Sequence, residues 1–240
     1  MNPRAVQASG IDWNDVDAVI LDVDGTLFDH LAMRPSMVAA LLRHVLTQRR
    51  GWRDLFVIWV FRRVRTRLAI AEAGEIGHQE FEVTSKSTGA SVAEVKEIVV
   101  RWLYQEPLSI MNRHVFPGVD EFLTTLKERG IRTGVFSDYP AEDKLKNLGL
   151  SVDVVRDASA TDIARLKPNP AGFLRVAELL GISPARCLII GDRDDRDGAA
   201  AKRGGFVFLK RTAGRQRSGQ YEFNCYHDLA RELKSMRPVK

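Results

Sequence analysis

Residues 18–27 read AVILDVDGTL, a run of apolar residues that ends at two aspartates and a glycine. A short apolar run of this kind predicts a buried β-strand, and the Asp-Gly pair that follows it predicts a turn. Asp22 and Asp24 are therefore expected at the carboxyl end of a strand. This is the edge at which open α/β sheets bind their ligands.

Four further apolar runs predict strands, and helical patterns separate most of them. These runs span residues 131–136, 152–155, 187–190 and 205–209. One helical pattern starts after Pro117-Gly118 and stops at Gly130, and another runs from Pro170 to Gly181. Strands that alternate with helices indicate a parallel sheet covered on both faces. The predicted fold class is therefore α/β, with a Rossmann-like core.

Strand patterns are missing between about residues 29 and 114, where the sequence favours three or four helices. The turns between these helices are expected near residues 50–51, 74–77 and 87–91. We therefore predict a core domain made of residues 1–28 and 115–240. An all-helical cap domain, residues 29–114, is inserted into it, with residues 29–32 and 113–116 as the two hinge linkers.

The composition is that of a folded protein, with 45% hydrophobic and 28% charged residues. The longest apolar run, residues 55–61, is too short to span a bilayer, and the first residues do not form a signal peptide. Cys187 and Cys225 have neither metal-ligand spacing nor the pattern of a disulfide framework. These features predict a cytoplasmic protein.

Asp22 and Asp24 also imply a cation. Two carboxylates that face each other repel, and one of them would have to keep a proton unless a positive charge lies between them. Mg²⁺ prefers oxygen ligands, so it resolves this conflict. We therefore expect a magnesium site at this edge of the sheet.

The segment Asp22–Thr26, taken together with three later segments, resembles the haloacid dehalogenase-like superfamily, in its phosphatase branch with a helical cap, similar to phosphoglycolate phosphatases. Its DVDGT matches the first motif of the family, Asp-x-Asp-Gly-Thr. Ser137 matches the second motif, and Lys167 the third. Asp192 followed by Asp197 matches the acidic fourth motif.

The resemblance implies a phosphomonoester hydrolase that works through an aspartyl-phosphate intermediate. Asp22 would be the nucleophile that attacks phosphorus. Asp24 would protonate the leaving alkoxide and then accept a proton from the hydrolytic water. Ser137 and Lys167 would bind the transferring phosphoryl oxygens.

The resemblance also implies a set of magnesium ligands. These would be the Asp22 carboxylate, the Asp24 backbone carbonyl and Asp192, while Asp197 would orient the water shell of the metal. The contribution of Asp195 stays open, because residues 192–197 supply more acids than the motif needs.

The expected substrate is a small phosphorylated metabolite or a sugar phosphate. Asp24 argues against a dehalogenase, since dehalogenases of this superfamily lack the second aspartate of the first motif. A sugar phosphomutase, a phosphatase acting on a lipid or prenyl phosphate, and a non-catalytic binding protein are the alternatives. Loss of turnover in Asp22→Asn would separate an enzyme from a binding protein.

The predicted cap carries an unusual concentration of arginine. Between residues 43 and 67 there are eight arginines and a single acid, Asp54. This segment predicts a surface for an extended anionic substrate, a weak contact with an acidic membrane, or a helix whose arginines are simply solvated. No nucleic-acid motif occurs, so no nucleic-acid partner is expected, and the protein is either a monomer or a homodimer.

Asp138 and three single histidines lie outside these motifs. Asp138 follows Ser137 and adds negative charge at the expected phosphate site, so it should either point away or repel some substrates. Histidines 30, 78 and 114 stand singly and are interpreted as structural or surface residues.

Overall fold

The computed structural model describes residues 9–72, 74–212 and 221–236, and a parallel sheet forms the centre of one lobe. Among these residues the sheet has six strands in the order β3-β2-β1-β4-β5-β6, and every neighbouring pair is parallel. The strands are β1 Ala18–Leu21, β2 Arg132–Ser137, β3 Val154–Asp157, β4 Cys187–Gly191, β5 Val207–Arg211 and β6 Glu222–Phe223. The predicted α/β class and all five predicted strands are confirmed.

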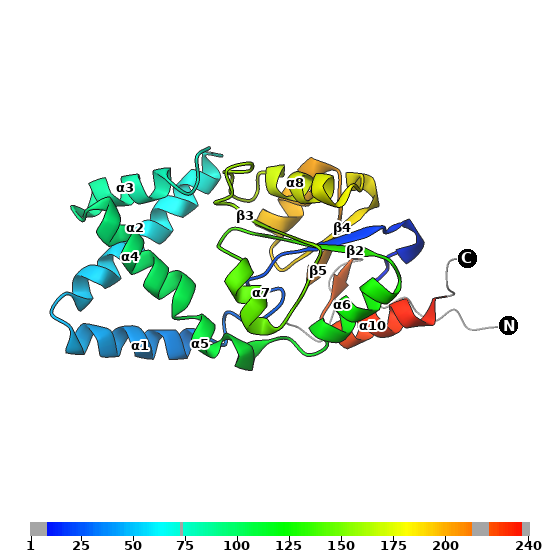
Figure 1. The fold of residues 1–240 in the computed structure, drawn as a ribbon, viewed down its shortest axis with the longest axis horizontal. Helices are drawn as coiled ribbons and strands as arrows, with labels where there is room; N and C mark the ends of the chain where they lie inside the picture. The colour runs from blue at the N-terminus through cyan, green and yellow to red at the C-terminus, as the bar shows by residue number, and fades with distance from the viewer. Residues whose placement is uncertain (1–8, 73, 213–220, 237–240) are drawn as a thin grey trace.

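Helices cover both faces of this sheet (Figure 1). In β1, Val19 and Leu21 belong to one apolar cluster, and Ala18 and Ile20 belong to another on the opposite face. Side chains alternate in this way because successive residues of a β-strand point to opposite faces of the sheet. Since both faces are buried, the sequence of β1 is apolar throughout. The first face packs on α6 Val119–Glu128, α7 Glu142–Leu148 and α10 Tyr226–Ser235, and the second on α8 Ala171–Leu180 and α9 Ala199–Gly204.

The segment between β1 and α6 forms a second lobe, which contains only helices and loops among its described residues (Figure 1). Its elements are α1 Arg34–Thr47, α2 Gly51–Ile70, α3 Gln79–Thr88, α4 Val92–Val99, a π-helical turn Val100–Gln105 and α5 Leu108–Met111. Phe61, Phe81 and Val95 lie in a separate apolar cluster of this helical lobe. The helical lobe therefore has a core of its own.

The break between α3 and α4 follows from local chemistry. Gly89 ends α3 in the left-handed region, with φ of 69°, where a residue with a side chain would be strained. Ser91 then caps α4, because its hydroxyl accepts from the Glu94 amide while the Glu94 carboxylate accepts from the Ser91 amide. The predicted turn near residues 87–91 is therefore confirmed.

The two chain connections between the lobes run side by side. Phe28 and Val115 form an antiparallel bridge, and the Asp29 amide donates to the His114 carbonyl at 2.8 Å. The predicted linkers, 29–32 and 113–116, therefore meet directly beside the end of β1. None of the helices in the described part of the chain has both the length and the apolar character needed to cross a membrane.

Candidate active site

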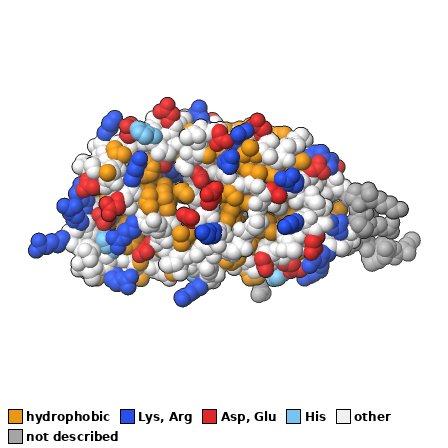
Figure 2. Space-filling model, in the orientation of Figure 1, with side chains coloured by type: hydrophobic (Ala, Val, Ile, Leu, Met, Phe, Trp, Pro, Cys, Tyr) orange, Lys and Arg blue, Asp and Glu red, His pale blue; other side chains and the backbone are white. Residues whose placement is uncertain are grey.

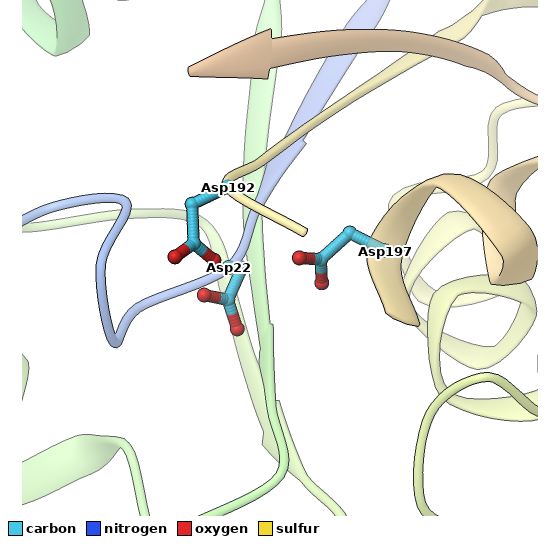
Figure 3. Close-up of side chains that lie close together, drawn as sticks. All are labelled: Asp22, Asp192 and Asp197. Atoms are coloured by element: carbon cyan, nitrogen blue, oxygen red, sulfur yellow. The ribbon is translucent and has the colours of Figure 1, made fainter. Parts of the chain in front are cut away.

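Three carboxylates meet at the carboxyl edge of the sheet (Figure 3). Asp22 follows β1 and Asp192 follows β4, and these two strands are neighbours in the sheet. Asp197 comes from a π-helical turn at Asp194–Gly198, and one oxygen of each carboxylate lies within 4.8 Å of the others. The strand order reverses between β1 and β4, which is the place where open α/β sheets form their ligand sites.

The turn after β1 holds Asp22 in place. Asp22 is 5% exposed, and the Thr26 hydroxyl donates to its Oδ2 at 3.2 Å. Gly25 has a φ of 95°, and a Cβ atom there would lie 2.4 Å from Oδ2 of Asp192. The Asp-Gly-Thr pattern therefore serves both the turn and the close approach of the two acids.

Lys167 lies between two of these carboxylates. Its Nζ donates to Asp22 and to Oδ1 of Asp197, the latter at 2.7 Å, and its side chain is 4% exposed. The backbone of Lys167 is fixed as well, because its amide donates to Asp138 at 3.0 Å and its carbonyl accepts from Arg196 at 2.8 Å. Asp138 thus turns its carboxylate to the Lys167 backbone, and the nearby Arg196 guanidinium offsets its charge.

The remaining acids of the 192–197 segment lie apart from this cluster. Asp195 pairs with Arg193 at 2.6 Å, and Asp194 pairs with Lys210. Ser137 stands at the end of β2, next to β1, and is fully buried. Its Oγ accepts from the Tyr139 amide at 3.2 Å.

The electrostatics of the cluster call for more positive charge. Burial raises the pKa of Asp22 to about 7, although Lys167 opposes this. Burial also raises the pKa values of Asp192 and Asp197. Burial on its own would lower the pKa of Lys167, but Asp197 and Asp22 raise it above its usual value. Lys167 thus pairs with only two of the three acids, and their hard oxygen donors suit a divalent cation such as Mg²⁺.

A cavity of about 850 Å³ lies between the sheet lobe and the helical lobe, in front of these residues. Asp22, Asp24, Lys167, Asp192 and Asp197 line one side of it, while α1 and α2 provide much of the other. Figure 2 shows apolar side chains on the face between the two lobes, next to acidic ones. Five of the six predicted site residues therefore line one cavity, and Ser137 lies buried at the adjacent strand end.

Comparison with known proteins identifies the family of this chain. A family model described as haloacid dehalogenase-like hydrolase matches residues 16–205. The chain belongs to this family. This hydrolase is 25% identical over 218 residues to a glyceraldehyde 3-phosphate phosphatase of Methanopyrus kandleri, and the aligned region covers 86% of each chain. The predicted resemblance is confirmed, and so is the predicted enzyme class, a phosphatase of this family.

Two other relatives of the hydrolase are informative. YhcW of Bacillus subtilis, which is described as a phosphatase, is 39% identical over 92 residues. That match covers 37% of this chain and 41% of YhcW. The fold resembles that of the 2-haloacid dehalogenase from Pseudomonas syringae, with a TM-score of 0.64 and 19% identity, over 91% of this chain and 98% of that one.

The hydrolase has a site residue that the motifs do not contain. Lys144, on α7, is buried, and its Nζ lies 2.5 Å from Oδ2 of Asp24. Ala141, Lys144, Leu145 and Leu148 recur at the spacing of one helix face, so Lys144 occupies a position that an apolar residue would normally fill. A lysine in an apolar stripe was the signal that could have identified it.

Arg65 was predicted only as part of the arginine-rich segment, but it is buried. It forms an ion pair with Glu80 at 2.7 Å, and its guanidinium also donates to the backbone carbonyl of Asp138. The guanidinium lies over the Tyr139 ring, 4.4 Å from its centroid. Arg65 thus links α2 of the helical lobe to the loop after β2, next to the active site.

His30 was interpreted as a structural or surface residue, and it lines the cavity. Its Nδ1 is buried and makes no hydrogen bond with the described residues. It faces the same side of Gly25 as the Asp192 carboxylate, since both would contact a Cβ placed there.

Proposed function

We propose that this hydrolase cleaves phosphate monoesters with Mg²⁺ and forms an aspartyl-phosphate on Asp22. The observation that carries this proposal is the environment of the Asp22 carboxylate. It is buried at a strand end, one oxygen accepts from Lys167, and Asp192 and Asp197 lie close enough to share a cation with it. A buried carboxylate beside a fixed lysine is suited to attack a phosphoryl group whose charge that lysine offsets.

The residues divide the chemistry between them. One oxygen of Asp22 attacks phosphorus in line, and the bond to the alkoxide breaks as Asp24 gives the alkoxide a proton. A water then attacks the phosphorus of the aspartyl-phosphate and gives its proton to Asp24. Inorganic phosphate leaves, and the Asp22 carboxylate is restored.

The other residues bind and orient. Lys167 and Ser137 hold the phosphoryl oxygens, and Asp197 positions Lys167 through its 2.7 Å ion pair. A magnesium ion held by Asp22, Asp192 and the Asp24 carbonyl would neutralise further charge on the phosphoryl group. Asp195 has no part in this arrangement, because it pairs with Arg193 at the surface.

We also propose that residues 29–114 act as a cap on a core formed by residues 1–28 and 115–240. The pairing of the two linkers beside β1 supports this division, since a small change there would move the whole helical lobe over Asp22. Such closure would exclude water from the aspartyl-phosphate until the alcohol has left. A cytoplasmic location stays a prediction.

Phosphate release from a panel of monoesters, with Mg²⁺ and with a chelator, tests the proposed reaction. We expect metal-dependent release that falls by at least about a thousandfold in Asp22→Asn, since this amide cannot act as the nucleophile. Asp195→Asn is the matched control and should stay within about twofold of the wild type. Full activity in Asp22→Asn would overturn the proposal, and isomerisation of a sugar phosphate without net release would indicate a phosphomutase.

A further inference from the structure

The cavity in front of Asp22 has two chemically different walls. The sheet lobe contributes carboxylates and lysines, whereas the described lining residues of the helical lobe include no carboxylate. Most of that second wall is hydrocarbon or aromatic, with α1 and α2 contributing Met37, Leu41, Leu55, Ile58 and Trp59. A phosphate group suits the first wall and has no partner along most of the second.

The size of the cavity makes this difference important. Its volume of about 850 Å³ is typical of a site for a molecule much larger than a phosphate group. Most of the space therefore remains for the alcohol part of the ester. The hydroxyls of a sugar would lose their hydrogen bonds to water against this wall and find few replacements, whereas a hydrocarbon chain would lose none.

The apolar wall also continues out of the cavity. Val38 and Trp59 line it and are 53% and 52% exposed, so they stand at its mouth. Beyond them, Leu42 on α1 and Phe56 on α2 are exposed too, and the Phe56 ring stacks on Trp59 with 6.2 Å between centroids. Apolar side chains left exposed beside the cavity favour an apolar ligand that covers them.

Two arginines stand beside this wall, where they suit the charged end of a ligand. Arg34 and Arg62 line the cavity and are exposed, whereas the third lining arginine of the helical lobe, Arg65, is held by Glu80. Arg34 and Arg62 can attract the phosphate from solution towards Asp22. Charged groups on the sheet-lobe side and hydrocarbon along much of the α1 and α2 side match an amphiphilic molecule.

We propose that the substrate is a phosphate monoester of a long-chain apolar alcohol, with the phosphate at Asp22 and the chain along α1 and α2. This inference rests on the proposed phosphatase function and adds the class of its substrate. It assigns specificity to the apolar wall residues, such as Met37 and Leu55, and not to the arginines of the 43–67 segment as a group.

Two alkyl phosphates that differ only in chain length test this inference. We expect kcat/KM for decyl phosphate, below its micelle concentration, to exceed that for propyl phosphate by at least about tenfold. Each buried methylene contributes a factor of about four, so two buried methylenes of the longer chain already give this ratio. Equal values for the two esters would overturn the inference while leaving the proposed phosphatase function intact.

Substitutions in the wall should act on the long ester alone. Met37→Gln and Leu55→Gln keep similar volume and helix propensity, and each should lower kcat/KM for decyl phosphate by about tenfold with propyl phosphate changed less than about twofold. Leu46→Gln is the matched control, since Leu46 is on α1, is 84% exposed and does not line the cavity. A similar loss on both esters in the wall variants would contradict a chain-binding role.

Binding of phosphonates separates this inference from the proposed reaction. Alkyl phosphonates are not hydrolysed, so calorimetry can compare decylphosphonate and propylphosphonate on the wild-type protein even without turnover. Tighter binding of decylphosphonate by about tenfold, weakened in Leu55→Gln, would support the apolar site whatever the activity result. Equal binding of the two phosphonates would overturn it, and absence of phosphate release from every ester would count against the phosphatase function alone.

Discussion

Lys144 and Asp24 form an ion pair in the lining of the active-site cavity, with 2.5 Å between Nζ and Oδ2. The Lys144 side chain is only 5% exposed, whereas Asp24 is 31% exposed and lines the cavity. The lysine comes from α7 and the aspartate from the turn after β1, so residues far apart in sequence are brought together. This pair holds the carboxylate of the proposed acid–base residue in one place.

Replacing Lys144 should therefore impair proton transfer more than substrate binding. We predict that Lys144→Met lowers kcat for an alkyl phosphate by about tenfold to a hundredfold, because a misplaced Asp24 protonates the leaving alkoxide poorly. The loss should be clearly smaller for p-nitrophenyl phosphate, whose leaving group needs little protonation. Steady-state kinetics on the two esters measures this difference.

The exposed Lys146 on the same helix provides the control for this experiment, and Lys146→Met should have nearly wild-type kinetics on both esters. Lys144→Arg keeps the charge and should recover part of the activity. An equal loss on both esters would show that Lys144 acts only through the general stability of the site.

A second prediction concerns the buried pair Arg65 and Glu80. Removing one partner leaves the other charge buried without compensation, so Arg65→Met should lower the free energy of unfolding by about 3–5 kcal/mol. Urea unfolding measures this, with exposed Arg67→Met as the control on the same helix. The double variant Arg65→Met/Glu80→Leu should recover much of the loss, and a double variant as unstable as the sum of both single ones would contradict this reasoning.

A third prediction concerns the packing of α8 beneath the strand that carries Ser137. A Cβ atom on Gly172 would lie 2.0 Å from Cζ of Phe136, so the ring would have to move. Gly172→Ala should therefore destabilise the protein by about 1–3 kcal/mol. Phe136→Leu combined with Gly172→Ala should cost less than the sum of the two changes, which urea unfolding of all four proteins would measure.

The fold was largely predictable because its central strands, β1, β2 and β4, are buried on both faces. The short apolar runs before Asp22, Ser137 and Asp192 each end at a polar residue, and a parallel sheet brings such endings to one edge. The short strand β6, Glu222–Phe223, could not be predicted, because a two-residue segment shows no periodicity. It forms by pairing with β5, which depends on tertiary structure.

The site was predictable where residues follow strands or, like Lys167 and Asp197, match a family motif. Lys144 and Arg65 lie within helices, on faces that the helical period assigns to the core, so the sequence alone suggests apolar positions there. Their burial becomes understandable only when Asp24 and Glu80 are seen opposite them, because a buried cation needs a nearby partner of opposite charge. Such partners are distant in sequence, and no local pattern relates them.

The last prediction concerns stability at low pH, at the edge of the sheet far from the active site. Burial alone would raise the pKa of Asp153, but hydrogen bonds from the Thr133 amide and hydroxyl, at 2.7 and 3.1 Å, together with Arg132, lower it below its usual value. A carboxyl with a lowered pKa stabilises the folded state above its unfolded pKa of 3.8, and that contribution is lost as the pH falls through the folded value.

Asp153→Asn should therefore reduce the free energy of unfolding at pH 7, and the difference from the wild type should shrink near pH 3. Urea unfolding at the two pH values measures this, with Thr133→Val expected to weaken the pH dependence, and an equal difference at both pH values would show that Asp153 does not act through its charge.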